Sequence, residues 1–125
     1  MDAKTIPHDR WREELDRFSR QHEGWIVSVT IEPSARSARV EAHDMPLQGV
    51  VADRDDAIAV IVGDTADARV THEVPHAVTV RIEMTDVGAE RALLIQDASG
   101  STTTVAFRAP MRPDEVDGVD VGHPF

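Results

Sequence analysis

Two histidine-containing pairs have residue types and a spacing that could do chemistry. His43 and Asp44 are adjacent, and a carboxylate can orient an imidazole as a general base when a nucleophile or water lies within reach. His72 and His76 are four residues apart, which on a helix would place both rings on one face, as in a zinc site. Pro75 interrupts any helix there, and in a strand the two side chains would lie about 13 Å apart, too far for one metal ion. We therefore expect two surface histidines at a strand end, and we expect Asp44 to begin a turn.

Aspartates gather around one predicted turn near the middle of the chain. Carboxylate oxygens are the ligands that divalent cations such as calcium prefer, but acidic turns are also common in proteins that bind no metal. We expect ordinary turn residues here and predict no metal site. The aspartates concerned are Asp53, Asp55, Asp56 and Asp64. The positions kept as speculative binding residues are His43, Asp44, Asp53, His72 and His76.

The sequence contains none of the common catalytic or cofactor-binding motifs. It has no glycine-rich phosphate loop, no Gly-x-Ser-x-Gly elbow and no His-Glu-x-x-His helix. It also has no cysteine, which excludes disulfides, thiolate catalysis and cysteine-ligated zinc. We predict no cofactor, and a non-enzymatic role is favoured over an enzymatic one.

The charge balance limits the classes of partner. Asp and Glu number 23 against 13 Lys and Arg, which gives a formal net charge of -10. Such a field repels phosphate backbones and anionic lipid surfaces, so a nucleic-acid role is disfavoured. No apolar run approaches about 18 residues and no signal-peptide pattern is present, so we expect a cytoplasmic protein without a membrane span.

The apolar pattern predicts one helix at the start of the chain. Trp11, Leu15 and Phe18 recur at helical spacing within residues 7–22 and form one apolar stripe. Gly24 supplies a natural stop. We therefore predict an amphipathic helix that packs through this stripe.

After Gly24 the apolar period changes from about 3.6 to 2, which is typical of half-buried strands. The strongest hairpin joins residues 47–52 to residues 57–62 through an acidic turn. The predicted strands are 25–32, 38–43, 47–52, 57–62, 68–74, 78–84, 91–96 and 102–108.

These elements predict an α+β fold in a single domain over residues 1–109. The expected architecture is the N-terminal helix followed by a mostly antiparallel, barrel-like (SH3/Sm-like) sheet of about seven or eight strands, because closure protects sheet edges. Residues 110–125 are rich in Pro, Gly and Asp and are expected to form an irregular tail.

Two stretches resemble a bacterial family of domains of unknown function, number 5335. One is Arg-Phe-Ser-Arg-Gln-His-Glu-Gly-Trp at residues 17–25, and the other is Pro-Leu-Gln-Gly-Val at residues 46–50, followed by Ala52 and Asp53. The likeness covers residues 6–119 and implies no activity and no catalytic residue. A weaker analogy connects Leu-Gln-Gly at residues 47–49 with Sm-like RNA-binding barrels. The acidity of the chain and its extra hairpin at residues 91–108 depart from that pattern, so the analogy concerns only barrel shape and ring-like assembly.

We therefore expect a small non-catalytic binding or self-assembly module, acting as a homo-oligomer or through a protein partner. One alternative is a small enzyme or metal-binding protein that uses His43, Asp44 and the acidic turns. A nucleic-acid adaptor is the third reading, and the net charge disfavours it.

Overall fold

The structure is a computed structural model in which residues 2–33, 37–63, 69–85 and 88–111 are described. The elements in chain order are β1 (Asp2–Thr5), the 3-10 helix η1 (His8–Arg10), α1 (Trp11–His22), β2 (Ile26–Glu32), β3 (Arg39–Ala52), the 3-10 helix η2 (Arg54–Asp56), β4 (Ile58–Val62), β5 (Val70–Val74), β6 (Ala77–Met84), β7 (Glu90–Asp97) and β8 (Thr102–Met111). In the described ranges, no helix has the length and apolar character needed to cross a membrane.

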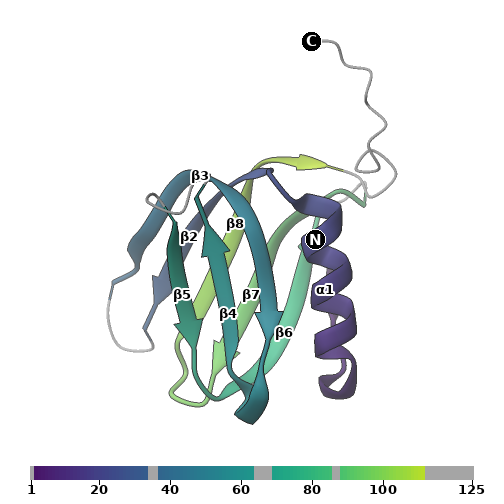
Figure 1. The fold of residues 1–125 in the computed structure, drawn as a ribbon, viewed down its shortest axis with the longest axis vertical. Coiled ribbons are helices and arrows are strands. Elements are labelled where there is room, and N and C mark those ends of the chain that lie inside the picture. The colour runs from purple at the N-terminus through teal and green to yellow at the C-terminus, as the bar shows by residue number, and fades with distance from the viewer. Residues whose placement is uncertain (1, 34–36, 64–68, 86–87, 112–125) are drawn as a thin grey trace.

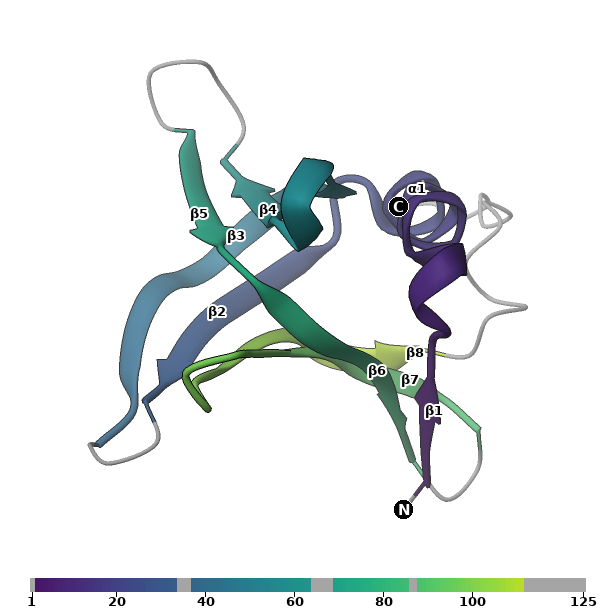
Figure 2. The ribbon, with the colours of Figure 1, turned by 90° about the horizontal axis from the view of Figure 1, so that it is seen from below.

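The strands form one eight-stranded sheet in the order β1-β6-β7-β8-β2-β3-β4-β5, and every neighbouring pair is antiparallel (Figure 1). The predicted helix followed by an antiparallel sheet is therefore confirmed. Closure into a barrel is not shown, because β1 and β5 end the strand order and no ladder joins them in the described residues. Figure 2 shows the two ends of the sheet: the chain runs from β5 directly on into β6 without pairing the two strands, and β1 lies beside β6 as its edge neighbour.

One face of the sheet and the apolar stripe of α1 enclose the core. Leu15 on the helix and Val27, Leu93 and Val105 on the strands are all 0% exposed. Burying each such side chain contributes about 1.5–3 kcal/mol relative to leaving it in water. Because the helix stripe is part of this core, α1 cannot leave the sheet without exposing it.

The helix begins and ends close to the predicted positions. Its first turn is the 3-10 segment η1, and the indole Nε1 of Trp11 donates to the carbonyl of Ile6 at 3.1 Å. At the other end Gly24 adopts a φ of 86°, a conformation that side chains disfavour. The Gly24 N–H donates to the carbonyl of Leu47 at 2.8 Å, and the Leu47 N–H donates to the carbonyl of Trp25 at 2.8 Å. The helix end is thereby tied to β3.

Two strand predictions need correction. β1 was not predicted, since a four-residue strand before a helix leaves too short a pattern to detect. Predicted strands 38–43 and 47–52 are one strand, β3, and Asp44 does not begin a turn within it. Asp44 instead has a φ of 50° at an irregular pairing with β2, where its N–H donates to the hydroxyl of Ser28 at 3.0 Å. This side-chain bond replaces a ladder bond, so the strand continues.

The C-terminal boundary also differs in part from the prediction. β8 runs to Met111, two residues beyond the predicted end of the domain at residue 109. Residues 112–125 lie outside the described residues, so an irregular tail there stays a prediction.

One helix residue takes the place of a strand neighbour. β2 begins at Ile26, opposite Pro46, so β3 has no strand beside it on that edge past Leu47. The Ser19 hydroxyl fills the gap: it accepts the Val50 N–H at 2.8 Å, and its oxygen lies 3.0 Å from the Val50 carbonyl. We call this contact of Ser19 with both backbone groups of Val50 the helix–strand joint.

The joint brings α1 close to the strand. A Cβ built on Gly49 would lie 3.6 Å from the Ser19 hydroxyl oxygen, which is ordinary van der Waals contact. A longer side chain at this position would have to displace Ser19 or project past it. The small residue at position 49 therefore keeps the space beside the joint open.

Replacing Ser19 by alanine removes the acceptor of the Val50 N–H, and an unsatisfied buried donor costs about 1–3 kcal/mol. We expect Ser19→Ala to lower the free energy of unfolding by about that amount in urea denaturation. The control is Ser37→Ala, at an exposed position, with an expected change within about 0.5 kcal/mol. Equal effects of the two substitutions would contradict the assigned role of the joint.

Candidate functional site

A cleft of about 620 Å³ lies between α1 and the outer face of β3 and β4. It begins at the helix–strand joint and extends along the helix toward its N-terminal end. We call it the α1–β3 cleft. Its lining residues are Asp9, Arg12, Glu13, Asp16, Ser19, Gln48, Gly49, Val50, Val51, Ala52 and Ile61.

The floor of the cleft is apolar. Val50 points into the core at 1% exposure, whereas the next residue, Val51, points outward and is 50% exposed. Ala52 and Ile61 beside it are half-buried. Strand alternation explains this arrangement, because successive side chains of β3 must face opposite sides of the sheet. An apolar strip therefore borders water on the floor of the cleft.

The wall of the cleft is formed by charged residues of η1 and α1. Asp9, Glu13 and Asp16 supply three carboxylates, and Arg12 supplies one guanidinium. All four residues are exposed. No ion pair of Asp9 or Arg12 occurs with any other residue that the structure describes. The wall thus has more negative than positive groups, and two of its charges are available to a guest.

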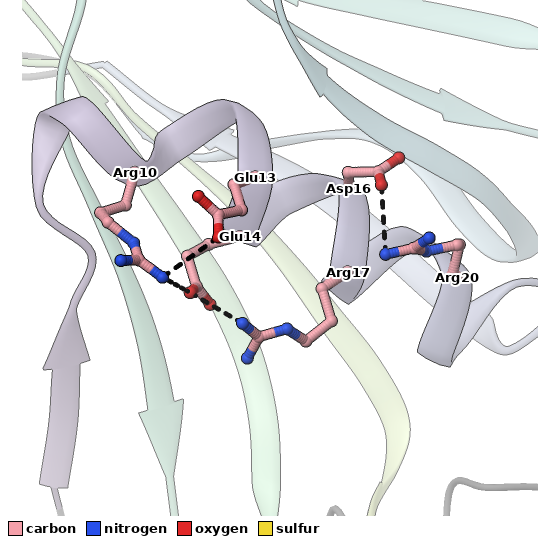
Figure 3. A network of polar contacts seen from close by, with 6 residues as sticks. All are labelled: Arg10, Glu13, Glu14, Asp16, Arg17 and Arg20. Atoms are coloured by element: carbon pink, nitrogen blue, oxygen red, sulfur yellow. Dashed lines mark hydrogen bonds and ion pairs between the residues drawn. The ribbon is translucent and has the colours of Figure 1, made fainter.

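Arginines on the helix already contact two of the wall carboxylates (Figure 3). Arg10 reaches Glu13 at 3.3 Å, and Arg20 reaches Asp16 at 3.3 Å. The side chains of these pairs are 47–72% exposed, so water screens them and each pair is worth at most about 1 kcal/mol. A guanidinium from a partner could exchange with them at little cost.

Two contacts hold the ends of the cleft. At the joint, the Gln48 amide donates to the carbonyl of Gly63 and so fixes the irregular pairing of β3 with β4. Near the N-terminal end of the helix, His8 Nε2 lies 2.6 Å from Asp56 Oδ1 and links η1 to η2. The helix is thus held to the β3–β4 hairpin by Ser19 at the joint and by the His8 contact near its N-terminal end.

None of the predicted binding residues lines this cleft. His43 and Asp44 lie on the outer surface of β3, with His43 Nε2 3.5 Å from Asp44 Oδ2 and His43 Nδ1 3.3 Å from the Ser28 hydroxyl. These are the residue types of a catalytic triad. However, the side chain of His43 is 76% exposed and that of Asp44 is 40% exposed, so water screens the pair. A triad depends on a buried carboxylate that orients the imidazole, and this cluster lacks one.

His72 and His76 are not brought together. His72 on β5 points inward, and its Nε2 lies 3.3 Å from the Thr103 hydroxyl on β8. His76 is in the turn between β5 and β6, has a φ of 54°, and accepts the Ala98 N–H at its carbonyl. The prediction of two surface histidines needs correction for His72, which is half-buried because it shares the inward face of β5 with Val74 and lies opposite Val60 of β4.

Burial of His72 lowers its pKa, and this effect outweighs the nearby Glu41 carboxylate, which raises it; the Arg39 guanidinium lowers it further. The neutral imidazole is therefore favoured in the folded protein.

The aspartates behave as turn residues. Asp53 caps η2, its carboxylate accepting the Arg54 N–H at 2.7 Å, and Asp56 is engaged by His8. Asp55 has a φ of 59° within η2. Asp64 lies outside the described residues. In the part of the chain that the structure describes, no group of three or more His, Cys, Asp or Glu could hold a metal ion.

Sequence reasoning missed a contact between a buried histidine and a glutamate beside the helix end. His22 is 0% exposed, its Nδ1 lies 2.8 Å from the Phe18 carbonyl, and its Nε2 lies 3.0 Å from Glu90 Oε1. A carbonyl only accepts, so Nδ1 is the donor to Phe18, whereas Nε2 and Glu90 Oε1 are buried at ion-pair distance without making a hydrogen bond. The rings of Phe18, Phe107 and Trp25 surround the imidazole at 4.4, 4.7 and 4.9 Å. The available signal was a histidine in the register of the apolar helix stripe, four residues after Phe18.

The two stretches that carry the family resemblance meet at these contacts. Residues 17–25 hold Ser19 and His22, residues 46–50 hold Leu47 and Val50, and their backbone and side-chain bonds join α1 to β3. A model of a family of unknown function (DUF5335) matches residues 2–116. The chain belongs to this family. No curated protein and no solved structure matches the chain. Family membership therefore supplies no activity.

Removing Glu90 takes away the carboxylate that lies 3.0 Å from the buried Nε2 of His22 and leaves this polar atom in apolar surroundings. We expect Glu90→Ala to lower the free energy of unfolding by about 1–3 kcal/mol. The control is Glu83→Ala, whose carboxylate lies 3.7 Å from Arg91 in a partly exposed pair and should cost at most about 1 kcal/mol. Chemical denaturation measures both, and a smaller loss for Glu90→Ala than for Glu83→Ala would exclude this role.

The lowered pKa of His72 predicts a pH effect of definite sign. As the pH falls through the ordinary pKa of 6.5, the unfolded chain binds a proton at this residue before the folded chain does, so stability is lost. Between about pH 8 and about pH 5, wild type should lose more unfolding free energy than His72→Gln. His43→Gln, at an exposed histidine, should follow wild type. Identical pH profiles for wild type and His72→Gln would rule out a contribution of His72 to the pH dependence of stability.

Proposed function

We propose that the protein is a non-catalytic binding module that holds an extended segment of a partner protein in the α1–β3 cleft. The observation that carries the proposal is the half-exposed apolar floor at Val51 and Ile61, next to a wall of charged side chains. An apolar strip beside a polar rim is the usual composition of a recognition surface.

The chemistry of the lining favours binding over catalysis. The cleft lining contains no histidine, and its hydroxyl, that of Ser19, is engaged with the backbone of Val50 and Leu15. The wall carboxylates are exposed, so they lack the water-excluded setting in which a carboxylate becomes an efficient general acid or base. The lining thus offers contacts to a partner but no activated group.

The shape of the cleft favours a protein segment. Its volume of about 620 Å³ falls within the range of about 300–1,000 Å³ that is common for binding sites. It follows the strand edge from Gly49 to Ala52, a length that suits a few residues of extended chain lying between a strand and a helix.

The other readings have less support. His43 and Asp44 are too exposed to favour an enzyme, and the net charge of -10 disfavours a nucleic-acid adaptor. Self-association, a barrel-like closure of the sheet and a cytoplasmic location stay predictions.

Selection from a random peptide display library against the full chain tests the proposal. Peptides that bind should lose about tenfold or more in affinity for Val51→Gln, since this change removes apolar contact from the floor. They should bind Val78→Gln like wild type, because Val78 is an equally exposed strand valine, at 55%, that does not line the cleft. If no selected peptide depends on Val51, the proposal is wrong.

A further inference from the structure

We infer that the segment bound in the α1–β3 cleft is basic, with arginine or lysine side chains alternating with apolar ones. This inference rests on the proposed function and names the chemistry of its partner. It follows from the charges of the wall, from the position of the floor beside them, and from the charge of the chain as a whole.

The wall charges favour a cationic guest. Three carboxylates, those of Asp9, Glu13 and Asp16, face one guanidinium, that of Arg12. Asp9 has no ion-pair partner among the residues described, and Glu13 and Asp16 each have an exposed contact at 3.3 Å with an arginine of the helix. A carboxylate that already holds a solvent-exposed guanidinium can hold another in the same geometry.

The floor explains the apolar component. Val51 and Ile61 line the same cleft as the wall carboxylates. A segment in extended conformation can therefore place one side chain on Val51 and Ile61 and direct the neighbouring side chains toward the helix. Long arginine and lysine side chains can also lay their methylene groups on such a surface while the charged end reaches a carboxylate. Arg12, which pairs with no carboxylate in the described part of the chain, is available to donate to main-chain carbonyls of the guest.

The net charge argues against the acidic occupants that the chain itself offers. A second copy brings a net charge of -10, and residues 112–125 contain four acidic residues and one arginine. Either would set carboxylates against Asp9, Glu13 and Asp16, and like charges placed opposite each other disfavour association. A basic segment from another protein is instead attracted by both the cleft and the whole molecule.

Fluorescence anisotropy with three labelled, capped hexapeptides tests this inference. One alternates arginine with valine, the second replaces each arginine by its neutral isostere citrulline, and the third replaces each arginine by glutamate. The arginine peptide should bind wild type about tenfold more tightly than the citrulline peptide at low salt. This ratio of affinities is the combined effect expected of a few exposed ion pairs. The glutamate peptide should bind more weakly still, and added salt should reduce the advantage of arginine.

Two double variants separate the cleft from the overall field, since each removes two negative charges. Asp9→Asn with Glu13→Gln should abolish most of the preference for arginine over citrulline. Glu32→Gln with Glu73→Gln, at exposed positions on β2 and β5, should preserve it. An equal loss in both double variants would overturn the inference, because the attraction would then come from the whole molecule.

The outcomes also distinguish this inference from the proposed function. If the citrulline peptide binds as tightly as the arginine peptide and both depend on Val51, the partner is not basic but the cleft still binds a segment. If none of the three peptides binds but library-selected peptides bind in a manner that depends on Val51, the inference of a basic partner is wrong and the proposed function still holds. If no peptide of any kind depends on Val51, the proposed function fails as well.

Discussion

The arrangement of this protein depends on how the free edge of β3 is satisfied beyond the end of its pairing with β2. Backbone N–H and C=O groups at a strand edge need partners, and here the Ser19 hydroxyl supplies them for Val50 while the helix end supplies them for Leu47. A helix therefore stands where another strand would continue the sheet. Because a helix is wider than a strand and meets β3 through one small residue, the outer face of β3 and β4 stays uncovered beside it.

The same helix is held from inside by its apolar stripe and by the pair of His22 with Glu90. The imidazole and the Glu90 carboxylate lie 3.0 Å apart within a cluster of aromatic rings, and their attraction offsets part of the cost of burying His22 Nε2 and Glu90 Oε1, which make no hydrogen bond. The helix end is thus fixed in both position and rotation. This rotation determines which helix residues, among them Arg12 and Asp16, are presented to the α1–β3 cleft.

The cleft places outward-facing aliphatic side chains beside exposed carboxylates. Water screens the charges, so their contribution to affinity is modest, and their main effect is to select among partners and speed encounter. In the proposed module the apolar floor would provide most of the free energy of binding. The proposed module would therefore recognise a partner by apolar contact and discriminate by charge, without any group activated for chemistry.

The sequence by itself determined the helix and most of the strands. The change of apolar period at Gly24 correctly separated α1 from the strands, and the acidic turn at Asp53 correctly marked the β3–β4 hairpin, because these features depend on residues close together in the chain. Tertiary structure alone decided the rest. Asp44 became part of a strand because Ser28, 16 residues away, satisfied its N–H, and His72 faces inward because β5 pairs with β4 in the register that places it opposite the buried Val60. The cleft could not be predicted, since its wall and floor are brought together by contacts between residues far apart in the chain, such as the hydrogen bond between Ser19 and Val50, 31 residues apart, and local periodicity contains no information about such contacts.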